Sequence, residues 1–325
     1  MRFKEIIRED IEDLRKNVIG AVRTTSDEQL LDKIYTVLNQ SGLSKRIATT
    51  LTTDTDTKGY VEDITKIIID TPGTYQEKWD FINAFPKGYV DIKLMTTGKY
   101  ISFDELLQGG EFTHKVFQAL KGYSPAGVKG PGEFAMAVMS PHIKITGKGD
   151  FNIGDKVIEV KASAGKTASS GGGRLGTPGT LHSDSVAKII MRYFPNLELA
   201  QGVNLGLKGF LELATKLPPE KRKKMAEETF GYIFGRGINI SELVNATMSG
   251  QALTPGYLKA NWERYQTDTG FDGVMLINFA RGALQYFDNA EKMLPNIYGI
   301  SNYLISKDKG AQARQILSQV TLKGE

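Results

Sequence analysis

The first 70 residues carry apolar side chains at the spacing of amphipathic helices. Two groups share this spacing: Ile6, Ile7, Ile11 and Leu14, then Leu30, Leu31, Ile34 and Leu38. A period near 3.6 residues places such side chains on one face of a helix. The pattern therefore predicts packing helices, the second over 27–38, then a threonine-rich loop over 49–59 and a further helix over 61–69.

Helical and strand periods alternate in the rest of the chain. Residues 88–103 predict a hairpin that turns at Thr96–Gly98, and helices follow over 111–122 and, after Pro131, over 132–139. Later patterns predict a helical insertion over about 183–262, then strands at 273–279, 283–287, 297–306 and 315–322 that complete a sheet. We therefore expect an α/β protein with a mostly helical N-terminal domain over 1–109 and a core over 110–325, separated at Gly109–Gly110.

Residues 148–161, KGDFNIGDKVIEVK, predict a second hairpin whose register follows from counting. If Gly154 and Asp155 form a two-residue turn, the glycine suits the first position of a type II′ turn. The predicted pairs are Ile153 with Lys156, Asn152 with Val157, Phe151 with Ile158 and Asp150 with Glu159. Side chains alternate between the faces of a strand. One face is therefore polar and the other apolar: Asp150, Asn152, Glu159 and Lys161 against Phe151, Ile153, Ile158 and Val160.

The polar face of this hairpin is suited to a divalent metal ion. Carboxylates opposed on neighbouring strands have Cβ atoms about 5 Å apart and repel each other unless a cation lies between them. Oxygen ligands favour Mg²⁺ or Mn²⁺, and Lys161 is placed to orient a hydroxide or a phosphate oxygen. Glu133, at the start of the helix over 132–139, is a further ligand candidate. Alternatively, the hairpin lies on the surface and carries an acidic pair beside a lysine without binding metal. Glu133 would then only stabilise the N-terminus of its helix.

Three motifs of this region carry a family resemblance: GPGE at 130–133, GD at 149–150 and EVK at 159–161. They resemble the signature of the PD-(D/E)XK nuclease superfamily, including phage-encoded members, with Gly149 where the family usually has proline. The resemblance implies a restriction-endonuclease-like core, a mixed central sheet flanked by helices, and Mg²⁺-dependent hydrolysis of DNA. Asp150, Glu159 and Lys161 would be catalytic with Glu133 assisting, and Asp150, Glu159 and Glu133 would bind the metal.

Composition narrows the choice of chemistry and compartment. The 325 residues include no cysteine, which excludes disulfides, thiolate zinc sites and a cysteine nucleophile. Three histidines lack the spacing of a zinc site. The charged N-terminus does not resemble a signal peptide, and no apolar run approaches the roughly 20 residues of a membrane span. We expect no membrane partner and a location in the host cytoplasm or in a virion.

Charge distribution favours a polyanionic partner. The net charge is only +4, but lysines recur from Lys115 to Lys166 around the acidic hairpin. DNA is the expected partner. Basic side chains around a carboxylate metal site attract the phosphate groups that the metal ion would also bind. The residues expected to contact phosphate are Lys129, Lys148, Lys166 and Arg174, the last two in the glycine-rich segment 162–180, which could equally be a surface linker. The basic run 221–224 is predicted to be a solvated helix face.

Other functions remain open at this level. A structural or interaction protein of a phage particle or its assembly machinery would keep the nuclease-like core as a scaffold and bind protein partners through its helical segments. A nucleotide-binding enzyme would depend on GGGRLG at 171–176, which lacks the required strand before it and helix after it. A second acid-x-lysine at 91–93 is rejected as the nuclease motif, because its partner Asp80 lies in an aromatic stretch with helical spacing.

Overall fold

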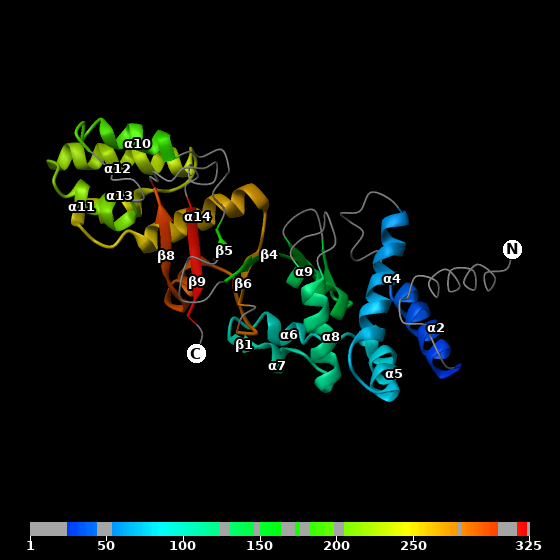
Figure 1. The fold of residues 1–325 in the computed structure, drawn as a ribbon. Coiled ribbons are helices and arrows are strands. Elements are labelled where there is room, and N and C mark those ends of the chain that lie inside the picture. Colours follow the sequence, from blue (N-terminus) through cyan, green and yellow to red (C-terminus); the bar gives the residue numbers. More distant parts are fainter. Residues whose placement is uncertain are drawn as a thin grey trace. The chain divides into compact units, whose positions relative to one another are not determined.

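The computed structural model in Figure 1 describes residues 25–43, 54–123, 131–145, 150–163, 173–175, 183–197, 205–278, 281–304 and 317–323. The chain is an α/β protein, as the order of its sequence patterns predicts. Its internal contacts divide it into two compact units, Met1–Val160 and Lys161–Glu325. The division lies within one strand, whereas the sequence pattern placed a boundary at Gly109–Gly110.

The first unit begins with packed helices, drawn in blue and cyan in Figure 1. Helix α2 (Thr25–Gln40) packs against α4 (Asp54–Asp70) and α5 (Tyr75–Ala84). The predicted apolar face of α2 is confirmed, since Leu30, Leu31, Ile34 and Leu38 are all buried. Helix α4 begins at Asp54, within the predicted threonine-rich loop. The predicted helix with Ile6 and Leu14 lies outside the described residues.

Residues 88–103 do not form the predicted hairpin. After the 3₁₀ helix η2 (Phe85–Lys87) they contain α6 (Ile92–Met95), β1 (Tyr100–Ser102) and the first residue of α7 (Phe103–Leu106). Asp91 accepts a hydrogen bond from Leu94 N at 2.9 Å and so caps α6, and Ser102 caps α7. Short polar side chains of this kind satisfy backbone N–H groups locally and compete with strand pairing.

The glycine pair Gly109–Gly110 is a helix start inside the first unit. Gly109 has φ 103°, and a Cβ atom there would lie 2.6 Å from the Thr113 hydroxyl oxygen, so only glycine fits. Helix α8 (Gly110–Gly122) follows and packs against α4, α5 and α9 (Pro131–Met139). The glycines therefore shape a helix start within the first compact unit.

An antiparallel sheet follows α9. Strand β2 (Ile143–Lys144) pairs with β3 (Phe151–Ile153), which pairs with β4 (Lys156–Ala162). Residues 134–139 of α9 are at most 1% exposed, so this helix is buried on every side. It also contacts β2. The predicted helix over 132–139 is confirmed, and it lies against the sheet that carries the polar face.

The second unit begins with the end of β4. There Ser163 N donates to Ile277 O of β6 (Gly273–Asn278) at 2.6 Å. Strand β6 forms an antiparallel hairpin with β7 (Ala283–Phe287), and both strands are buried along their whole length. The remaining strands, β5 (Gly173–Arg174), β8 (Ile297–Tyr303) and β9 (Leu317–Leu322), form a sheet of their own in the order β5-β9-β8. The late strands thus exist as predicted, but β8 and β9 do not extend the β6–β7 pair.

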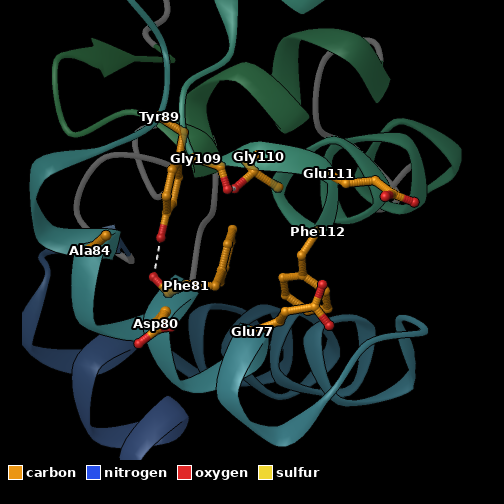
Figure 2. Close-up of a pocket in the computed structure, with 10 residues that line it drawn as sticks. Glu77, Asp80, Phe81, Ala84, Tyr89, Gly109, Gly110, Glu111 and Phe112 are labelled. Atoms are coloured by element: carbon orange, nitrogen blue, oxygen red, sulfur yellow. Dashed lines mark hydrogen bonds between the residues drawn. The ribbon is translucent and has the colours of Figure 1, made fainter.

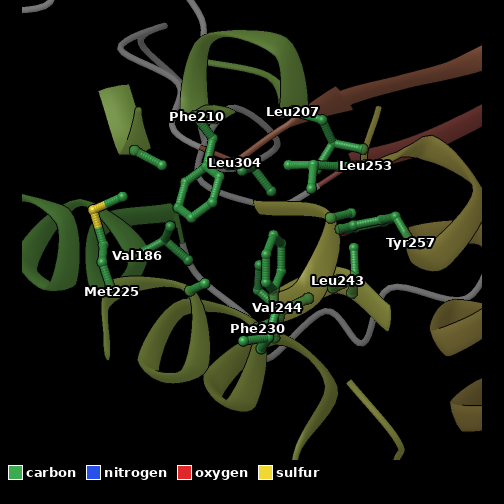
Figure 3. Close-up of a cluster of buried hydrophobic side chains, with 14 of the residues drawn as sticks. Val186, Leu207, Phe210, Met225, Phe230, Leu243, Val244, Leu253, Tyr257 and Leu304 are labelled. Atoms are coloured by element: carbon green, nitrogen blue, oxygen red, sulfur yellow. The ribbon is translucent and has the colours of Figure 1, made fainter. Parts of the chain in front are cut away.

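In the described residues, the predicted helical insertion is a lobe that contains five helices of the second unit: α10 (Ser183–Met191), α11 (Leu207–Ala214), α12 (Pro219–Phe234), α13 (Ser241–Ser249) and α14 (Thr254–Thr269). Figure 3 shows its apolar core, in which Phe210 and Phe230 pack with ring centroids 5.1 Å apart. The chain then forms α15 (Ala290–Met293) and η4 (Leu294–Asn296) before β8.

One residue of the basic run 221–224 has a structural role. The Arg222 guanidinium donates to the carbonyl oxygens of Ala214, Thr215 and Leu217, at 3.0–3.2 Å, and to Met248 O at 3.1 Å. These carbonyls lie at or just beyond the C-terminus of α11 and near that of α13, where a cation is favoured. Only the lysines of this run therefore match the predicted solvated face.

Candidate functional site

The hairpin β3–β4 has the register that counting predicts. Ile153 is opposite Lys156, Asn152 opposite Val157 and Phe151 opposite Ile158. Gly154, at the first turn position, has φ 60°, the positive value that the predicted turn requires. The apolar face is buried as expected, because Phe151, Ile153, Ile158 and Val160 are at most 8% exposed. A strand pair with one buried face keeps this register, since a slip by one residue would turn every side chain to the other face.

The regular ladder ends before the fourth predicted pair, Asp150 with Glu159. Asp150 N donates to Ile158 O at 3.0 Å, although Ile158 is already opposite Phe151. Two residues facing one is typical of a β-bulge. The Asp150 carboxylate turns toward β4, and its Oδ2 accepts a hydrogen bond from Val160 N at 2.8 Å. The carboxylate therefore continues the strand pairing in place of a backbone carbonyl.

Glu159 and Lys161 lie two residues apart in β4, so their side chains leave the strand on the same side. Glu159 is 6% exposed, which is unusual for a carboxylate and costly unless it is paired or coordinated. Lys161 is half-buried, and its Nζ lies over the ring of Tyr265 at 5.6 Å from the centroid. The acid-x-lysine motif is thus held in a shielded place and is not a freely solvated surface pair.

Glu133 lies in the first turn of α9 and is half-buried. Its helix is fixed by aromatic contacts, with the Phe134 ring 5.4 Å from that of Tyr123 and 6.2 Å from that of Tyr60. Tyr123 in turn donates to the Asp63 carboxylate at 2.5 Å, and burial together with this bond raises the pKa of the phenol. The first turn of α9 is therefore a rigid place for an acidic side chain.

The donor atoms of the hairpin fit the predicted metal, but they form a small set. Among the described residues, no group of three or more histidine, cysteine, aspartate or glutamate side chains is placed to hold a metal ion. Asp150 and Glu159 supply carboxylate oxygens, the donors that Mg²⁺ and Mn²⁺ prefer. Mg²⁺ usually keeps several waters and takes substrate phosphate oxygens as further ligands. A site with few protein ligands is consistent with that chemistry.

Most of the residues predicted to contact phosphate fall in segments that the structure does not describe. Lys129, Lys148 and Lys166 lie outside the described residues. Arg174 lies in β5, where it is opposite Gln319 of β9. The predicted role of these four residues in binding DNA therefore stays a prediction.

The side chains that hold Lys161 could not be identified from the sequence. Tyr265 lies in α14, and its ring packs edge-on against Phe271 at 5.3 Å, which packs against Trp262 at 5.2 Å. Trp262 is itself buried. No spacing rule relates Tyr265 to β4, because the contact depends on how α14 packs in the second unit.

A cavity of about 380 Å³ in the first unit lies apart from the predicted residues. Figure 2 shows its aromatic wall, in which the Tyr89 hydroxyl donates to Phe81 O and the two rings stack at 4.6 Å. Burial raises the pKa of the Tyr89 phenol. The acidic side chains Glu77, Asp80 and Glu111 also line the cavity. Carboxylates repel phosphate, so this cavity is not suited to DNA.

Comparisons with protein-family models, with curated proteins and with solved structures found no match to this chain. The resemblance to the PD-(D/E)XK superfamily therefore depends on the motif residues alone. No helix in the described ranges has both the length and the apolar character needed to cross a bilayer.

Proposed function

We propose that this protein is a Mg²⁺-dependent deoxyribonuclease with a restriction-endonuclease-like core, whose catalytic residues lie on the hairpin β3–β4. The observation that supports the proposal most is the hairpin itself. Its register and turn follow the sequence motif, and its apolar face is buried behind the polar one. Asp150, at its start, is hydrogen-bonded to the strand that carries Glu159 and Lys161.

Each polar residue has a defined role in this proposal. Asp150 and Glu159 would hold the divalent ion, and Glu133 would act on it through water, because the described residues do not bring three acidic side chains together at one metal position. A bound divalent ion lowers the pKa of its water and polarises the phosphate. Lys161 donates from its ammonium group to the attacking water or to a phosphate oxygen, where negative charge develops in the transition state. Basic residues near the hairpin, Lys129, Lys148, Lys166 and Arg174, bind the DNA backbone.

The proposal is tested by incubating the purified protein with supercoiled and linear DNA in Mg²⁺ or Mn²⁺. We expect cleavage by the wild type and a loss of about 100-fold or more in Glu159→Gln and Lys161→Met, the size found when a group that stabilises transition-state charge is removed. Lys156→Met is the matched control, because Lys156 is exposed at the tip of the same hairpin and on its other face. Absence of cleavage by the wild type with either metal contradicts the proposal.

A second function is favoured by one observation. The Asp150 carboxylate accepts from Val160 N, so it already has a structural use in holding the strands together. A structural protein of a phage particle or its assembly machinery, with protein partners and a nuclease-like scaffold, would need Asp150 for that reason alone. It predicts that wild type, Glu159→Gln and Lys161→Met are equally inactive on DNA, while Asp150→Ala still lowers stability.

A further inference from the structure

The C-terminal half of α14 presents a fixed aromatic ring to Lys161. The Lys161 Nζ lies 5.6 Å from the centroid of the Tyr265 ring, within the range of an energetically useful cation–π contact. Tyr265 itself is held edge-on by Phe271, which is 1% exposed. The ring is therefore a rigid partner for the flexible lysine.

We infer that Tyr265 is a positioning residue for Lys161, which keeps the ammonium group in one place beside the polar face of β4. Lysine is a point charge on a flexible stem of four carbons, and contact with a fixed ring narrows the rotamers it samples. An ammonium group over an aromatic face is favoured about twofold to thirtyfold, the range that corresponds to the usual strength of such contacts. The catalytic use of this placement rests on the proposed nuclease function, but the placement itself does not.

The same helix links this contact to the core of the lobe. Near its start, Tyr257 packs against Phe234 with ring centroids 5.0 Å apart, and Ala260 belongs to the same apolar cluster. One turn before Tyr265, Asn261 donates to Leu175 O, in the glycine-rich segment, at 2.7 Å. A helix fixed at so many points cannot shift without breaking buried contacts. The packing of the helical lobe within the second unit therefore sets the position of the Tyr265 ring over Lys161.

The contact is tested by NMR of protein labelled with ¹³C-lysine. A cation over a ring face lies in the shielding region of the ring current, so we expect upfield-shifted Cε protons for Lys161. The resonance is assigned by its loss in Lys161→Arg. The shift should persist in Tyr265→Phe, which keeps the ring face, and disappear in Tyr265→Leu. Tyr232→Leu is the matched control, since Tyr232 is a partly buried lobe tyrosine that packs on the apolar core.

The functional consequence is measured on the same variants as Mg²⁺-dependent DNA cleavage. We expect Tyr265→Leu to lower kcat about twofold to thirtyfold with little change in KM, and Tyr265→Phe to restore it. An unshifted Lys161 resonance in the wild type overturns the inference, whether or not DNA is cut, and so does full cleavage by a folded Tyr265→Leu. A shifted resonance in a wild type that cuts no DNA overturns the nuclease proposal and leaves the lysine placement standing.

Discussion

The hairpin β3–β4 and the segment 88–107 satisfy their backbone hydrogen bonds in opposite ways. In the hairpin, each strand finds its partner a few residues away, across a two-residue turn. In the segment, Tyr89 N donates to Met139 O at 2.8 Å, and Tyr89 O accepts from Gln108 N at 2.8 Å. Asp91 adds a local cap through its side chain. The first is a local structure, whereas the second combines pairing between its own ends with a partner outside the segment, Met139.

Burial along the chain also differs between the two strands of the hairpin and the segment. Strand β3 alternates, with Phe151 and Ile153 buried and Asn152 between them only half-buried, whereas in β4 Glu159 is buried between two buried apolar residues. In the segment, the neighbours Tyr89 and Val90 are both buried, at 3% and 8% exposed. Consecutive buried residues show that the chain there is enclosed on more than one side. The local pattern of polar and apolar residues therefore predicts burial in β3, where it alternates, but it does not predict the burial of Glu159 or of the neighbours Tyr89 and Val90.

The largest expected effect is on the buried face of the hairpin. Phe151→Ala should lower the free energy of unfolding of the first unit by about 3–5 kcal/mol, the usual range for a buried phenylalanine, because Phe151 and its partner Ile158 are fully buried. Urea unfolding followed by circular dichroism measures the loss. Asn152→Ala, on the other face of the same strand, should cost less than about 1 kcal/mol. Equal losses would show that the two faces are not distinct.

A substitution in the turn of the hairpin should lower the free energy of unfolding by a smaller amount. Gly154 has φ 60°, and a Cβ atom added there would meet no other atom within 4 Å. Gly154→Ala should therefore cost about 1–2 kcal/mol, entirely from the left-handed backbone. Gly122→Ala is the control, because Gly122 has equally open space without a positive φ. A neutral Gly154→Ala in urea unfolding would contradict the assigned turn.

The smallest effect is expected in the segment that depends on distant contacts. Tyr89→Phe removes the hydrogen bond to Phe81 O and should cost about 1 kcal/mol at neutral pH. Burial raises the pKa of Tyr89 above the unfolded value of about 10, so its contribution is complete below that pH and decreases as pH rises further. Unfolding measured from neutral to strongly alkaline pH should show a shallower loss of stability in Tyr89→Phe than in wild type. Tyr75→Phe, at an exposed tyrosine, is the control and should leave the free energy of unfolding at neutral pH close to that of the wild type.

Much of the fold could be predicted where short-range patterns are strong. The apolar face of α2, the start of α9 at Pro131 and the strands β6 and β7 all follow from periodicity and turn residues. The pairing of β5 with β9 could not be predicted, because two-residue strands have no period and the partners lie far apart in the chain. Arg222 illustrates the same limit, since a cation in a basic run gives no sign that four carbonyls converge on it.

For the candidate site, the sequence by itself determined the hairpin, its register, and the strand positions of Glu159 and Lys161. Counting residue pairs back from the turn, and alternating side chains between the two faces, is enough to predict these features. Both strands and the turn lie within one short segment. Only the tertiary structure decided that the Asp150 carboxylate bonds to Val160 N, that Glu159 is buried and that Lys161 lies over Tyr265. The last two depend on elements distant in the chain, whereas the first depends on the irregular pairing at Asp150, which counting residue pairs does not predict.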